Sequence, residues 1–63
     1  MSDFTLENHG SIFLLAPVSA SAMLWARENL PEDAPTFGLS VAIEHRYIDP
    51  IVEGIVEAGL SVE

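Results

Sequence analysis

Residues 4–15 read FTLENHGSIFLL, and this succession of apolar and polar residues predicts a β-hairpin. FTLE alternates apolar and polar residues, as a strand with one buried face does. Asn8 and Gly10 tolerate positive φ and predict a turn. SIFLL is apolar on both faces, as in a central strand, and Pro17 is expected to end it.

A helix is predicted over residues 20–29, which hold strong helix formers and no Gly or Pro. Ser19 suits the N-cap, Asn29 could take a left-handed C-terminal position, and Pro31 stops the helix. The positions at helical spacing that should face the sheet are Ala22, Trp25, Ala26 and Leu30.

After a loop with two prolines, residues 36–44 predict one continuous strand by their strict alternation. One face is expected to be buried and the other to be small, polar and open to solvent or a partner. The expected inner residues are Phe37, Leu39, Val41 and Ile43; the expected outer residues are Gly38, Ser40, Ala42 and Glu44.

A second helix is predicted over residues 47–58, with an apolar stripe of Ile48, Ile51, Val52, Ile55 and Val56. Asp49 could cap it, with Pro50 in the first turn and Gly59 as the stop. Gly54 either permits a close approach to the sheet or is merely tolerated. Tyr47 could pack at the edge of the core or belong to an interface.

Residues 60–62 could add a short edge strand. The order is then β-β-α-β-α with a possible final β, in a single α+β domain over residues 1–63. We expect a two-layer sandwich in which two helices cover one face of a small, mostly antiparallel sheet. The ferredoxin-like arrangement is the nearest common type, although a hairpin precedes the first helix.

Composition limits the function classes. The chain has 63 residues, 49% of them hydrophobic, and no cysteine, so it has room for one core and must be stabilised by packing. Residues 1–4 lack the basic and apolar regions of a signal peptide, and the apolar run at residues 12–18 is too short to span a membrane. We therefore expect a cytoplasmic protein.

The charge balance is strongly acidic, with ten Asp and Glu residues against two Arg and a formal charge of −8. Such a surface repels nucleic acid and anionic membrane, and electrostatic steering would favour a basic protein partner. The alternative is that the charge only keeps a small apolar domain soluble.

No residue pattern predicts an enzyme. The serines lie outside any nucleophile motif, and there is no P-loop or dinucleotide fingerprint. His9 and His45 could bind a metal with Glu7 or Glu44, but they lack the spacing of specific zinc motifs, and ordinary surface histidines are the favoured interpretation. We expect no catalytic residues, no metal and no cofactor.

The acidic residues are more informative by position. Asp49, Glu53 and Glu57 recur every four residues, so they form a carboxylate stripe opposite the apolar stripe, with about 6 Å between successive Cα atoms along the axis. A second acidic group consists of Glu28, Glu32 and Asp33. The stripe is either a solvated helix face or a row of carboxylates that imitates nucleic-acid phosphates.

Several segments resemble a family of small bacterial and phage-associated proteins. They are residues 7–12, 25–31, 37–54 and 58–60, which together span nearly the whole chain. Among its short acidic members, the chain resembles an anti-CRISPR inhibitor of the type I-C system. The resemblance implies a compact ferredoxin-like protein that imitates DNA and binds the crRNA-guided Cascade-type surveillance complex in a bacterial host. It transfers no role to any single residue.

Two function hypotheses follow. In the first, a monomeric inhibitor places its six carboxylates in a basic DNA site of a Cascade-type effector subunit and blocks target DNA. In the second, the protein is a structural, assembly or homodimerisation module that uses the open sheet face with Ser40 and Ala42, and its acidity serves solubility. A metal-assisted enzyme using His9 and His45 is a distant third.

Overall fold

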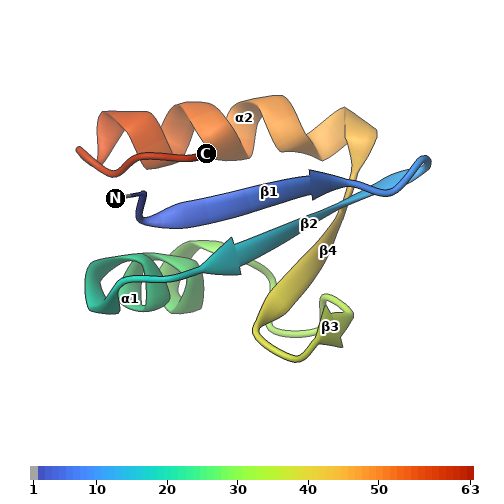
Figure 1. Cartoon of the computed structure of the whole chain (residues 1–63), viewed down its shortest axis with the longest axis horizontal. Helices are drawn as coiled ribbons and strands as arrows, with labels where there is room; N and C mark the ends of the chain where they lie inside the picture. Colours follow the sequence, from blue (N-terminus) through green and yellow to red (C-terminus); the bar gives the residue numbers. More distant parts are fainter. Residues whose placement is uncertain (1) are drawn as a thin grey trace.

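The computed structural model describes residues 2–63 and has a β-β-α-β-β-α order. The elements are β1 (Phe4–Asn8), β2 (Ile12–Pro17), α1 (Ala20–Asn29), β3 (Thr36–Phe37), β4 (Ser40–Glu44) and α2 (His45–Glu57). The four strands form an antiparallel sheet in the order β1-β2-β4-β3 (Figure 1). The α+β class is confirmed, with one more strand than the sequence predicted.

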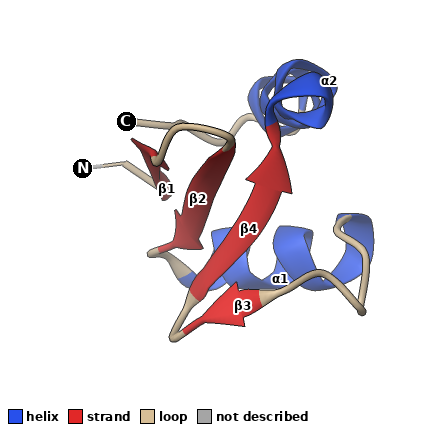
Figure 2. Ribbon diagram, turned by 90° about the vertical axis from the view of Figure 1, so that its right-hand side faces the viewer, coloured by secondary structure: helices blue, strands red, loops and turns tan. Residues whose placement is uncertain are grey.

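The chain folds as two layers, because both helices cover the same face of the sheet (Figure 2). Phe4 from β1, Leu15 from β2 and Ile55 from α2 are the largest fully buried side chains between the layers. Leu15 lies opposite Leu6 on β1 and Val41 on β4, so the inward-facing residues of three strands form one apolar surface. The opposite face of the sheet has no helix over it.

The predicted hairpin is confirmed at residues 4–17. Its turn is held by the Asn8 side chain, which accepts a hydrogen bond from the Gly10 amide at 3.0 Å, and Gly10 has φ of +83°. Pro17 ends the strand as predicted, since it is the last residue of β2, where it lies opposite Phe4.

The C-terminal residues complete the other edge of the sheet. Val62 forms a parallel bridge with Phe4, and the Phe4 amide donates to the Ser61 carbonyl at 3.0 Å. The Leu6 amide donates to the Glu63 carbonyl at 3.0 Å. The short edge strand predicted at residues 60–62 is therefore present as a single bridge, and Figure 1 shows both termini on the same side.

This bridge explains the relation to the ferredoxin-like arrangement. From β2 onward, the order through Val62 is β-α-β-β-α-β, which is the ferredoxin-like order. β1 is an additional strand, and it lies between β2 and the C-terminal bridge.

The prediction of one strand over residues 36–44 is wrong. Gly38 adopts φ of +64° and turns the chain between β3 and β4, as glycine does at the first central position of a type II′ hairpin turn. Phe37 and Leu39 are consequently 60% and 69% exposed instead of buried. Alternation alone did not reveal the turn, because Gly38 occupied an outer position of an unbroken pattern.

The predicted start of the second helix is also wrong. α2 begins at His45, directly after β4, and Glu44 occupies the N-cap without a side-chain hydrogen bond. Asp49 is therefore not a cap, and Pro50 lies inside the helix, where it cannot donate to the carbonyl of residue 46. The predicted stop is confirmed, since Gly59 has φ of +82° and the Leu60 amide donates to the Ile55 carbonyl at 3.1 Å.

α1 and α2 touch through Trp25. A Cβ atom added to Gly54 would lie 3.2 Å from Cζ2 of Trp25, so this glycine permits a close approach to the other helix, not to the sheet. Trp25 also packs edge-on against Phe4, with ring centroids 5.9 Å apart. Asn29 does not take the left-handed position predicted for it; its side-chain amide donates to the Trp25 carbonyl at 2.9 Å.

The predicted N-cap of α1 is confirmed and is tied to the N-terminal segment. Oγ of Ser19 accepts from the Ala22 amide at 3.1 Å and donates to a carboxylate oxygen of Asp3 at 2.7 Å. One hydroxyl thus satisfies a free amide of the helix and anchors the residue that precedes β1.

Replacing Ser19 with alanine should lower the free energy of unfolding by about 1 kcal/mol, because the first turn of α1 loses its acceptor. Urea unfolding followed by circular dichroism measures this change. Ser21→Ala is the matched control, since Ser21 is exposed within the same helix and the change there should be within a few tenths of a kcal/mol. Equal losses in the two variants would contradict the capping role.

Candidate functional site

Four of the ten acidic residues interact with other side chains of the domain. Glu7 pairs with Nε2 of His9 at 3.3 Å, and Glu44 pairs with Arg46 at 3.4 Å. Glu63 accepts a hydrogen bond from the Ser2 hydroxyl at 3.1 Å. Asp3 accepts bonds from Ser19 and from the amide of Ser61, the latter at 3.0 Å. These four carboxylates therefore have partners within the fold.

The other six carboxylates are free. Within residues 2–63 none of them forms an ion pair or a side-chain hydrogen bond, and all six side chains are exposed. They are the residues that the sequence singled out, namely Asp49, Glu53, Glu57, Glu28, Glu32 and Asp33. The structure thus separates the acidic residues into a bonded set and a free set, and the free set lies wholly on α1, α2 and the loop that follows α1.

The stripe on α2 keeps its spacing in the structure. Asp49, Glu53 and Glu57 all fall inside the continuous helix, opposite the buried Ile48 and Ile55. Like charges four residues apart destabilise a helix by a few tenths of a kcal/mol per pair. Since Arg46 pairs with Glu44, no cation on this helix offsets that repulsion within the described chain, and a cationic partner would relieve it.

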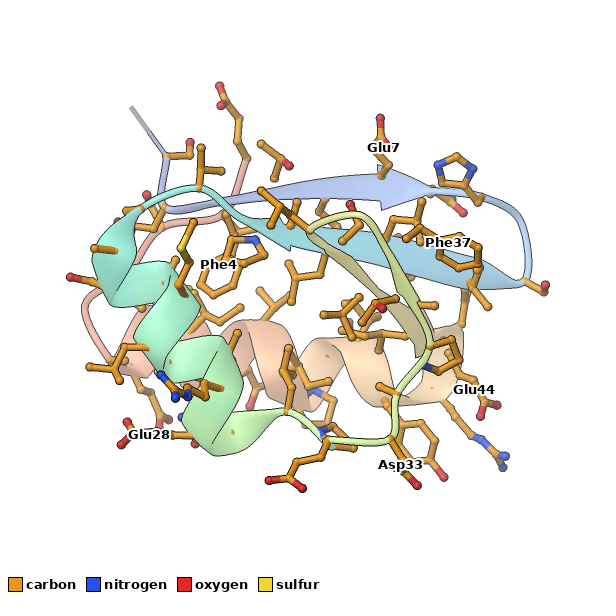
Figure 3. All side chains as sticks on the ribbon, turned by 90° about the horizontal axis from the view of Figure 1, so that it is seen from below. Phe4, Glu7, Glu28, Asp33, Phe37 and Glu44 are labelled. Carbon is orange, nitrogen blue, oxygen red and sulfur yellow. The ribbon has the colours of Figure 1, made fainter. Side chains whose placement is uncertain are left out.

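Glu28, Glu32 and Asp33 form a second group. Figure 3 shows Glu28 and Asp33 on the side of the helices, and Glu7 at the opposite edge above the sheet. Glu28 lies at the end of α1, and Glu32 and Asp33 lie in the loop after it. The six carboxylates therefore belong to the helical layer, three on α2 and three at the end of α1 and in the following loop.

The histidines lie in unrelated surroundings. His9 is in the β1–β2 turn beside Glu7, whereas the His45 ring lies against Phe13 with centroids 4.4 Å apart. Within residues 2–63 no three His, Cys, Asp or Glu side chains gather as metal ligands would.

A groove of about 610 Å³ is the feature that the sequence did not predict. It runs between the loop after α1, β4 and the N-terminal half of α2. Pro31 and Pro35 come from the loop, Tyr47 and Pro50 come from α2, and Asp33 and Glu44 supply carboxylates. The two prolines and the ambiguous Tyr47 were the only indication in the sequence, because the groove joins residues that are far apart along the chain.

No helix in the described part of the chain is both long and apolar enough to cross a membrane.

The fold and the free carboxylates define a small acidic α+β protein with an apolar groove beside its second helix. Comparison with family models, curated proteins and solved structures found no match.

The bonded Asp3 carboxylate affects stability in a way that depends on pH. Hydrogen bonds from the Ser19 hydroxyl and the Ser61 amide lower the pKa of Asp3 from its ordinary value of 3.8. Since the pKa is lower in the folded state, ionised Asp3 stabilises the fold above the unfolded-state pKa, and this contribution disappears as the pH falls through the folded-state value.

Asp3→Asn should therefore destabilise the protein at pH 7, and its difference from the wild type should shrink as the pH falls below 3.8. Urea unfolding at a series of pH values measures this difference. For Ser21→Ala, which does not touch Asp3, the difference in free energy of unfolding from the wild type should be the same at every pH. A difference for Asp3→Asn that is constant over the same range would contradict the role of the charge.

Proposed function

We propose that this protein is a non-catalytic inhibitor that binds the nucleic-acid site of a basic protein by presenting carboxylates in place of phosphates. The observation that carries the proposal is the division of the acidic residues. Four have partners within the domain, whereas six on the helical layer are exposed and unpaired in the described chain. Sites that bind DNA are lined by Lys and Arg, which a row of free carboxylates can neutralise.

The α2 stripe supports the proposal because it is rigid and preordered. Its three carboxylates project from one helix that packs through Ile48 and Ile55 against the core, so binding would cost only side-chain entropy. The net charge of −8 would also steer the protein toward a basic surface, faster at low salt.

The sequence resemblance names the first target to test, a type I-C Cascade-type surveillance complex. In this proposal the protein occupies a Lys- and Arg-lined site on one subunit and excludes target DNA. The inhibitor is monomeric, needs no cofactor and acts in the cytoplasm of the bacterial host.

Neutralising the stripe tests this function. Asp49→Asn, Glu53→Gln and Glu57→Gln together should weaken competition with labelled target DNA for the complex about thirtyfold, because three exposed charge pairs contribute about 2 kcal/mol. The affinity of the wild type should also fall as salt rises.

The control for this experiment removes charges from the bonded set outside the groove, through Glu7→Gln and Glu63→Gln, and its match on the stripe is the double variant Glu53→Gln and Glu57→Gln. Circular dichroism confirms that all variants are folded. If the two double variants lose affinity equally, net charge alone determines binding; if the wild type does not compete with DNA at low salt, the proposal fails.

A second candidate function uses the sheet face that has no helix over it. Leu14 and Ala42 lie opposite one another in the register and point away from the buried Leu15 and Ile43. An apolar centre on an uncovered sheet face favours the assembly or homodimerisation alternative.

Light scattering separates the two functions. The inhibitor should have the monomer mass of 6.8 kDa at low salt, where copies of a chain with charge −8 repel one another. A stable dimer that Leu14→Asp converts to monomer would instead favour the assembly module.

A further inference from the structure

We propose that the groove beside α2 binds an arginine side chain presented by a partner protein. This inference goes beyond the proposed function, because it concerns a groove outside the α2 stripe that shares only Asp33 with the six free carboxylates, and it does not depend on which macromolecule carries the arginine. It rests on the shape of the groove, its charges and a guanidinium that the structure already places at its edge.

The walls of the groove suit the aliphatic part of an arginine. Pro31 and Pro35 face it from the loop, and Pro50 and Tyr47 face it from α2. Apolar walls of this kind pack against the methylene groups of a long cationic side chain while its charged end stays near solvent. Prolines keep the backbone stiff, so the walls need little ordering when a ligand binds.

The charges of the groove select a cation. Asp33 and Glu44 both line it, and the described lining residues include no Lys or Arg (Figure 3 shows both carboxylates at the same corner). Asp33 has no ion pair among residues 2–63, so it is available to a ligand. Carboxylates accept paired hydrogen bonds from a guanidinium, which makes arginine a better match than the compact ammonium of lysine.

Arg46 shows that this edge accepts a guanidinium. Its Cζ atom lies 5.1 Å from the centre of the Tyr47 ring, and its Nη2 atom lies 3.4 Å from Glu44. Two groove-lining residues, Tyr47 and Glu44, thus already contact one guanidinium. The Arg46 side chain is 72% exposed, so it can move away from Glu44 when another arginine binds, without disturbing the core.

The other candidate occupant, a second copy of the chain, fits less well. Each copy has only two arginines, Arg27 and Arg46, and a charge of −8 opposes association. A partner with an exposed arginine on a basic surface would pair with the carboxylates of the groove and would also be attracted by the net negative charge of the domain.

The test is a titration of the ¹⁵N-labelled 63-residue protein with N-acetyl-arginine-amide, followed by amide chemical shifts. We expect saturable shifts around Asp33, Glu44 and Tyr47, with a dissociation constant on the order of 1 mM. N-acetyl-citrulline-amide has the same shape without the charge and should bind at least tenfold more weakly. Equal binding of both compounds, or shifts confined to the α2 stripe, would overturn the proposal.

Three variants locate the site. Asp33→Asn and Tyr47→Leu should each weaken arginine binding about threefold to tenfold. Asp49→Asn also removes one negative charge, but from the exposed stripe, and should change the affinity for arginine less than twofold. Arg46→Gln should strengthen binding, because it releases Glu44.

Each result has a defined meaning. Losses of equal size in Asp33→Asn and Asp49→Asn would reveal general charge attraction and contradict the groove. Binding to Arg46→Gln that is no tighter than to the wild type would contradict the part assigned to Glu44. Since no DNA or surveillance complex is present in the titration, its failure leaves the inhibitor proposal standing, and failure of the DNA competition leaves the groove standing.

Discussion

The packing of Trp25 holds the two layers in their arrangement. Its ring contacts Phe4 from the sheet edge-on and lies against the backbone of α2 at Gly54, so one side chain from α1 joins three elements. A chain of 63 residues buries too little surface to tolerate a loose contact at this point. The position of α2, and with it the carboxylate stripe and one wall of the groove, therefore depends on a glycine that lets an aromatic ring approach closely.

Acidic residues have opposite effects on stability in two parts of the fold. Asp3 is held by two serines and ties both ends of the described chain to the start of α1, so its charge stabilises the fold. Asp49 and Glu53 repel each other along α2, so their charges destabilise the helix slightly. A domain selected only for solubility could disperse such charges, whereas here the unpaired ones are confined to the helices and the adjoining loop. This separation favours a binding role for the helical layer.

Much of the fold could be predicted from the sequence because its signals are local. The hairpin turn at Gly10, the Ser19 cap and the Gly59 stop each depend on a few neighbouring residues, and all three are confirmed. The β3–β4 turn was missed because Gly38 fitted an alternating pattern. The start of α2 was missed because Pro50 suggested that the first helical turn lies near residue 50, whereas the helix begins at His45. For the site, sequence spacing identified the α2 stripe, but the groove could not be found, since only the tertiary fold brings residues 12 to 51 together.

The bridge between Val62 and Phe4 has a consequence for biosynthesis. The backbone groups along the outer edge of β1 gain their partners from residues 61–63, which the ribosome adds 53 or more residues after Asn8. Until then the nascent chain carries an open strand edge, the kind of template on which β-rich chains aggregate. Pairing of this edge therefore waits for residues 61–63, and a stop codon before them would release a chain whose edge stays unprotected.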